Sequence, residues 1–152
     1  MTRSGARSRS SARIGSSALI YLDASALVKV ILVEAESHAL RSWIAERPER
    51  LSSAIVAIEL RRATRRVASE RAGANDLTRE TDVVLSGVAL IPLDERIAQV
   101  AASLDPLLLR TLDAIHLASA LSLGGVEALV TYDARLAAAA AGAGLAVASP
   151  GA

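Results

Sequence analysis

A short apolar segment that ends in an aspartate constrains the fold of this chain more than any other feature. Residues 18–22 are apolar, Asp23 follows them directly, and residues 25–33 then show the spacing of a helix. A buried strand that leads straight into a helix is typical of a parallel α/β sheet, in which ligands bind outside the carboxyl ends of the strands. Asp23 is therefore either a helix N-cap, a task that Ser25 could share, or a functional carboxylate.

Strands and helices alternate along the rest of the chain. Further strands are expected at 51–54, 88–93 and 127–132, with an edge strand at 145–148. Further helices are expected at 36–46, 53–72, 75–86, 94–103, 111–123 and 133–142. This alternation predicts an α/β fold with a central parallel sheet of about four to five strands and helices on both faces. We expect a single domain over 19–148, followed by a short C-terminal tail at 149–152.

Composition excludes several kinds of site. The 152 residues include no cysteine and only two histidines, His38 and His116, so thiolate zinc sites, cysteine nucleophiles and multi-histidine metal sites are excluded. Aromatic residues make up 2% of the chain, which argues against the stacking platforms that many single-strand RNA-binding proteins use.

The net charge of +1 is unevenly distributed. Residues 1–18 hold four of the 17 basic residues and no acid, which leaves 13 basic against 16 acidic residues, or −3, for residues 19–152. We expect residues 1–18 to be a disordered basic N-terminal extension. The mildly acidic remainder is not typical of a protein that binds nucleic acid only through a basic surface. With no secretory signal pattern and no bilayer-spanning apolar stretch, a cytoplasmic location is expected.

Three further acidic residues occupy positions where they could join Asp23. Glu59 shares a helical stripe with residues 52, 56, 63 and 67, which faces inward, and a carboxylate there is costly unless it is paired or bound to a metal. Asp113 lies in the first turn of a helix, where an acid also favours the macrodipole. Asp133 ends an apolar strand and opens a helix, as Asp23 does.

In a parallel sheet these four carboxylates could meet in one cleft. They would repel one another strongly unless a cation compensates. Oxygen ligands without histidine or cysteine select a hard ion, Mg²⁺ or Mn²⁺, and such a site suits phosphoryl transfer. Helical spacing turns His116 away from Asp113, so we interpret it as a core or rim histidine.

Four segments, in this order, resemble the PIN domain and, more narrowly, the VapC-type toxins of prokaryotic toxin–antitoxin pairs. The segments are Tyr21–Lys29, Ser53–Leu60, Leu112–Ala118 and Thr131–Leu136. Each is a weak signal alone, but the ordered set is specific, and the resemblance covers residues from about 19 to 148. Many such toxins begin at the first strand, so the N-terminal extension departs from the pattern.

The resemblance implies a PIN-like three-layer α/β/α fold and a metal-dependent endoribonuclease that hydrolyses RNA phosphodiester bonds. Asp23 and Asp113 would be the most direct Mg²⁺ ligands. Glu59 would complete the metal shell or orient the attacking water, and Asp133 would act directly or through a water molecule.

Supporting residues and partners follow from the same resemblance. Ser25 and Thr131 would hold the carboxylates in place. The expected partners are RNA, a second copy in a homodimer, and a VapB-type antitoxin whose tail covers the acidic cleft and whose other end binds operator DNA. Arg110 and Arg135 are candidate phosphate-binding residues. The arginines at 61, 62, 65 and 66 could bind phosphates, bind the antitoxin or form a solvated helix face.

Three alternative functions can be compared with this sequence pattern. A haloacid-dehalogenase-like phosphatase needs a second aspartate two positions after Asp23, where this chain has Ser25. A dinucleotide-binding domain is excluded because no glycine fingerprint follows Leu22. The remaining alternative is a catalytically silent PIN-fold binding module that acts only through its antitoxin and DNA-repressor complex.

Overall fold

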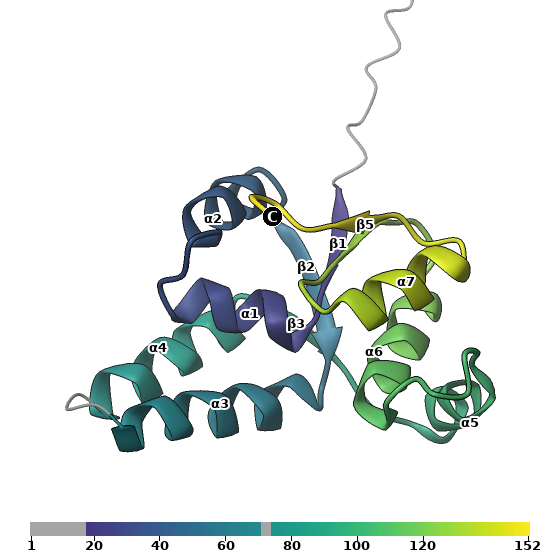
Figure 1. Cartoon of the computed structure of the whole chain (residues 1–152), viewed down its shortest axis with the longest axis horizontal. Helices are drawn as coiled ribbons and strands as arrows, with labels where there is room; N and C mark the ends of the chain where they lie inside the picture. Colours follow the sequence, from purple (N-terminus) through teal and green to yellow (C-terminus); the bar gives the residue numbers. More distant parts are fainter. Residues whose placement is uncertain (1–17, 71–73) are drawn as a thin grey trace, which may run out of the picture.

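A five-stranded parallel sheet forms the centre of the molecule (Figure 1). The computed structural model describes residues 18–70 and 74–152. The strands lie in the order β3-β2-β1-β4-β5, and every neighbouring pair is parallel. Their bounds are β1 (Leu19–Leu22), β2 (Glu49–Ser53), β3 (Ala89–Ile91), β4 (Val126–Val130) and β5 (Val147–Ala148).

Helices lie on both sides of this sheet, which completes three layers and confirms the predicted α/β/α fold (Figure 1). The first side carries α1 (Ala24–Ile31), α2 (Ser37–Ala45), α3 (Val56–Glu70) and α4 (Ala74–Ser86). The second side carries α5 (Glu95–Ser103), α6 (Thr111–Leu121) and α7 (Ala134–Gly142). No helix within the described ranges is long and apolar enough to cross a bilayer.

The two faces of β1 build two separate apolar cores. Ile20 and Leu22 pack with buried residues of α1, α2, α3 and α4, whereas Tyr21 packs with Leu117 and Leu136 of α6 and α7. This division follows from the alternation of side chains along a strand. All three β1 side chains are at most 1% exposed, as expected for the central strand of a parallel sheet.

Two predicted elements differ from the structure. The predicted buried strand at 88–93 is the short edge strand β3, with Ala89 and Leu90 exposed, because it pairs on one side only. The helix predicted from residue 53 begins at Val56, because Ser53 is the last residue of β2 and a turn follows it. The predicted end of that helix, near residue 72, lies outside the described residues, as does the predicted disorder of residues 1–17.

The sheet has a topological switch point between the carboxyl ends of β1 and β4. The chain leaves β1 through α1 and α2 on one side of the sheet, and it reaches β4 through α5 and α6 on the other side. In open α/β sheets, ligands bind where the connections of two neighbouring strands run to opposite sides of the sheet. The residues immediately after these two strands are Asp23 and Thr131–Asp133.

Candidate active site

Asp23 is held at the end of β1 by a dense set of hydrogen bonds. Its carboxylate caps α1 by accepting a bond from the Ala26 backbone N–H at 2.9 Å. The Ser25 hydroxyl donates to it from 2.7 Å, and the Thr131 hydroxyl donates from 2.6 Å. Ser25 is itself fixed by the backbone N–H of Tyr132 at 2.8 Å. The interpretation of Asp23 as an N-cap is therefore confirmed, and Ser25 and Thr131 do orient this carboxylate.

Asp23 nevertheless keeps capacity for one further contact. A carboxylate offers about four lone-pair sites, and Ser25, which carries a single hydroxyl hydrogen, can donate to only one oxygen at a time. Ala26, Ser25 and Thr131 therefore fill three of these sites. Burial raises the pKa of Asp23, which is 4% exposed, and the three hydrogen bonds oppose that increase. Asp23 is therefore a desolvated carboxylate held in one orientation at the carboxyl end of β1.

Asp113 approaches the same place from the first turn of α6. Its Oδ2 atom is buried and has no hydrogen-bond partner among the described residues. Burial raises the pKa of Asp113, and the nearby carboxylates of Asp133 and Asp23 raise it further, whereas Arg110 and His116 lower it. Three acidic groups thus lie within electrostatic reach of one another, and one of them keeps an unpaired oxygen.

Asp133 combines a cap with a position beside Asp113. Its Oδ1 atom accepts bonds from the Arg135 and Leu136 backbone N–H groups at 2.8 and 3.1 Å, which confirms it as the N-cap of α7. Its own N–H donates to the Thr131 hydroxyl at 3.0 Å, which in turn donates to Asp23. Thr131 therefore links the Asp23 carboxylate to the backbone of Asp133.

Glu59 lies on α3 and is tied to a histidine. Its Oε2 atom is 2.7 Å from Nε2 of His116, and the Glu59 side chain is 21% exposed. Glu59 and Ser25 both line a groove of about 560 Å³ on the α1 and α3 side of the sheet. Glu59 is therefore only partly buried, and its ring partner comes from α6, the helix that carries Asp113.

The chemistry of the candidate ligands fits a divalent cation. All candidate ligands are carboxylate oxygens, which suit Mg²⁺ or Mn²⁺. Across the described ranges, no three acidic or histidine side chains are gathered tightly enough to form a ready-made metal cluster. Mg²⁺ is commonly held by one or two carboxylates and several waters, so the unpaired Asp113 Oδ2 and the spare site on Asp23 fit this ion.

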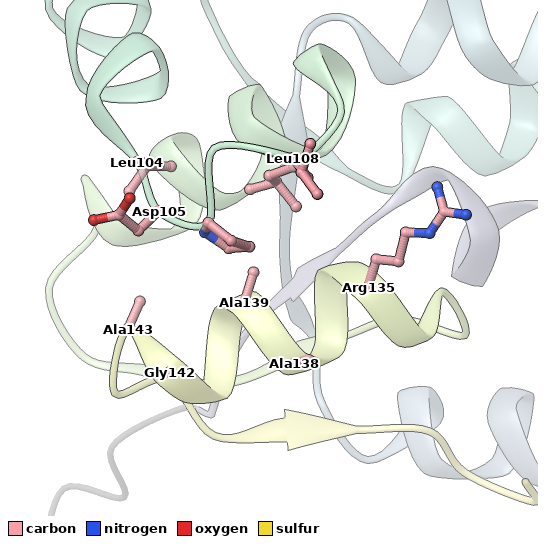
Figure 2. Close-up of a pocket in the computed structure, with 10 residues that line it drawn as sticks. Leu104, Asp105, Leu108, Arg135, Ala138, Ala139, Gly142 and Ala143 are labelled. Atoms are coloured by element: carbon pink, nitrogen blue, oxygen red, sulfur yellow. The ribbon is translucent and has the colours of Figure 1, made fainter.

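The arginines occupy different positions around this site. Arg110 precedes α6 and acts electrostatically on Asp113. Arg135 lines an apolar groove between α7 and residues 104–109 (Figure 2). The arginines of α3 are exposed. Arg61 pairs with Asp82 at 2.7 Å, and residues 62, 65 and 66 line a surface groove.

The pairing of His116 with Glu59 could not be found by inspecting single motifs. His116 is 2% exposed, as expected for a core histidine. The expectation that helical spacing turns it away from Asp113 is wrong, because residues three positions apart are neighbours on a helix, and His116 acts electrostatically on Asp113. Helical spacing relates His116 only to residues of its own helix and does not reveal Glu59. A weak signal was available, because a buried histidine and an inward-facing glutamate both need polar partners.

Comparison with known proteins identifies the family. A family model described as PIN domain matches residues 20–142. Ribonuclease VapC35 of Mycobacterium tuberculosis is 44% identical over 138 residues, which make up 88% of this chain and 98% of the relative. Ribonuclease VapC46 of the same species is 41% identical over 136 residues, with the same coverage. The chain therefore belongs to the PIN-domain family, in its VapC-type branch.

Two solved structures share the fold at low sequence identity. VapBC2 from Rickettsia felis, bound to a DNA fragment from its promoter, gives a TM-score of 0.64 at 16% identity and covers 86% of this chain and 97% of that one. Mycobacterium tuberculosis VapC20, described as a Sarcin-Ricin loop cleaving toxin, gives 0.63 at 19% identity and covers 86% and 99%. At these identities the likeness concerns the fold alone.

Proposed function

We propose that this protein is the toxin of a type II toxin–antitoxin system and a Mg²⁺-dependent endoribonuclease that hydrolyses RNA phosphodiester bonds. The observation that carries the proposal is the unpaired, buried Oδ2 of Asp113, which lies within electrostatic reach of Asp133 and Asp23 at the carboxyl ends of β1 and β4. The family membership and the relatives named ribonuclease support it.

Each residue has a distinct part in this proposal. Asp113 and Asp23 would hold the cation directly, and Asp133 would hold it directly or through a water molecule. Ser25 and Thr131 keep the Asp23 carboxylate in one orientation by their hydrogen bonds of 2.7 and 2.6 Å. Bound Mg²⁺ would supply a water of lowered pKa and neutralise charge on the phosphate.

The remaining groups would orient the water and the substrate. Glu59 would complete the metal shell or orient the attacking water. Arg110, which acts electrostatically on Asp113, would contact a phosphate of the RNA. Arg135 is less well placed for that role, because it lines the apolar groove on α7 (Figure 2).

The proposal includes three partners in the cytoplasm. RNA is the substrate, and a VapB-type antitoxin would cover the acidic crevice and connect the complex to operator DNA, as the VapBC2 complex on promoter DNA suggests. A second copy of this chain would form a homodimer. Leu107 and Leu108, which are 91% and 92% exposed beside a groove of about 580 Å³, support such self-association.

Cleavage of total RNA by the purified, antitoxin-free protein tests the proposal. The protein is incubated with Mg²⁺, Mn²⁺ or EDTA, alongside Asp113→Asn and the matched control Asp82→Asn, which alters an exposed carboxylate on α4. We expect discrete fragments from the wild type and the control that vanish with EDTA and with Asp113→Asn. Absence of cleavage by folded wild-type protein under every metal would favour the silent binding module.

A further inference from the structure

A buried chain of hydrogen bonds runs from the core of the protein to Glu59. The Ser53 backbone N–H donates to the Tyr21 hydroxyl at 2.9 Å, and that hydroxyl is 2.8 Å from Nδ1 of His116. Nε2 of the same ring is 2.7 Å from Glu59 Oε2. Tyr21 is fully buried and His116 is 2% exposed. The chain thus joins β2, β1, α6 and α3.

The hydrogen-bonding capacity of each group fixes the direction of the bonds. The Ser53 N–H can only donate, so it occupies a lone pair of the Tyr21 oxygen. Burial raises the pKa of Tyr21, so its hydroxyl keeps the hydrogen and can donate it to Nδ1 of His116. A neutral ring that accepts at Nδ1 carries its hydrogen on Nε2 and donates it to the Glu59 carboxylate.

The opposite tautomer does not satisfy the same contacts. It would bring a hydrogen on Nδ1 to the Tyr21 hydroxyl and leave an acceptor nitrogen facing an acceptor carboxylate at 2.7 Å. Glu59, which can only accept, therefore requires a hydrogen on Nε2, whereas the Tyr21 hydroxyl can pair with either tautomer at Nδ1. The Glu59 side chain, bonded through Oε2, lines the groove shared with Ser25.

We infer that His116 is a positioning residue, which donates the hydrogen of Nε2 to one oxygen of Glu59 and leaves the other oxygen to serve the active site. The functional part of this inference rests on the proposed nuclease activity. The structural part does not, because the tautomer is a property of the protein without metal or RNA. A histidine that merely filled the core would require neither a fixed tautomer nor a partly exposed partner.

Nitrogen NMR of the full-length, metal-free protein decides the structural part. Two-dimensional ¹H–¹⁵N spectra of the histidine rings distinguish a hydrogen on Nε2 from one on Nδ1. We expect His116 to carry a hydrogen on Nε2, and Glu59→Leu, which removes the acceptor, to produce a mixture of tautomers. A wild-type ring with its hydrogen on Nδ1 alone would overturn the inference, whether or not the protein cleaves RNA.

Activity of three variants decides the functional part. The amide nitrogen of His116→Gln can take the place of Nε2 as a donor to Glu59, whereas His116→Leu has no donor. His38→Leu, on the exposed face of α2, is the matched control. We expect His116→Leu to lose about 10- to 100-fold in cleavage rate or Mn²⁺ affinity, His116→Gln to recover most of it, and the control to match the wild type.

These measurements separate a failure of the inference from a failure of the proposed function. Folded His116→Leu protein that binds Mn²⁺ and cleaves RNA as the wild type does would refute the positioning role. If His116→Leu does not fold, His116→Gln is compared with His116→Asn, whose shorter amide does not reach the position of Nε2. An equal loss of cleavage rate in these two variants would then refute the positioning role. A wild-type protein that never cleaves RNA removes the nuclease proposal, while the NMR result and the Mn²⁺ affinities still decide the inference.

Discussion

Replacing Asp113 by asparagine should stabilise the metal-free protein. The carboxylate of Asp113 bears three costs in the folded state: partial burial, the neighbouring charges of Asp133 and Asp23, and an unpaired Oδ2. An asparagine side chain removes the charge and can donate its amide hydrogens to one of those carboxylates. The change keeps nearly the same volume, so no cavity opens in α6.

The gain should be modest. Because Asp113 is only partly buried, water screens its repulsion by Asp133 and Asp23, and exposed charge interactions contribute about 1 kcal/mol or less. We therefore expect about 0.5–1 kcal/mol at neutral pH. For a domain of this size that gain is a rise in Tm of about 1–4 °C.

The gain should depend on pH in one direction. Because the pKa of Asp113 is higher in the folded than in the unfolded state, the folded protein binds this proton more readily. The free energy of unfolding of the wild type therefore falls as pH rises from the ordinary aspartate range near about 4 through the folded pKa, and the full penalty remains above it. The difference between Asp113→Asn and wild type should be largest near neutral pH and shrink towards acid pH.

Thermal unfolding in EDTA, followed by circular dichroism between about pH 5 and pH 8, measures this difference. Asp82→Asn is the matched control; because it removes an attractive exposed ion pair with Arg61, it should be neutral or slightly destabilising. The reasoning is wrong if Asp113→Asn lowers the Tm of the metal-free protein, or if its gain increases as the pH falls.

Two further predictions concern the support of Asp23 and the exposed leucines. Thr131→Val keeps the shape of the side chain but removes the 2.6 Å bond to Asp23, so the free energy of unfolding should fall by about 1–3 kcal/mol in chemical denaturation; an unchanged value would show that this bond does not stabilise the fold. The double variant Leu107→Ser and Leu108→Ser should keep the Tm of the wild type, since both side chains are almost fully exposed, but reduce self-association in analytical ultracentrifugation; an unaltered sedimentation profile would exclude these leucines from a homodimer interface.

Local signals in the sequence were sufficient for most of the fold. The apolar run before Asp23 and the equivalent run before Asp133 predicted parallel strands that end in helix caps, and both caps are present. Burial on both faces of these strands makes the pattern strong. β3 was assigned correctly as a strand but wrongly as buried, because an apolar run does not show whether a strand has one neighbour or two.

The candidate site was only partly predictable, because its decisive contacts join distant segments. The positions of Asp23 and Asp133 follow from strand ends, but the bond from Thr131 to Asp23 spans 108 residues. The contact between His116 and Glu59 spans 57 residues, and the one between Tyr21 and His116 spans 95. Local periodicity carries no information about such contacts, and it also cannot reveal that Asp113 keeps an unpaired oxygen.

Direct measurement of Mn²⁺ and Mg²⁺ binding by isothermal titration calorimetry tests the central claim, that the carboxylates after β1 and β4 and at the start of α6 form a cation site. The wild type, Asp113→Asn and Asp82→Asn are titrated in the absence of RNA and antitoxin. The account predicts saturable binding by the wild type and the Asp82→Asn control, and a loss of at least about 10-fold in affinity for Asp113→Asn. Equal affinity in all three proteins, or no saturable binding by the folded wild type, would contradict it.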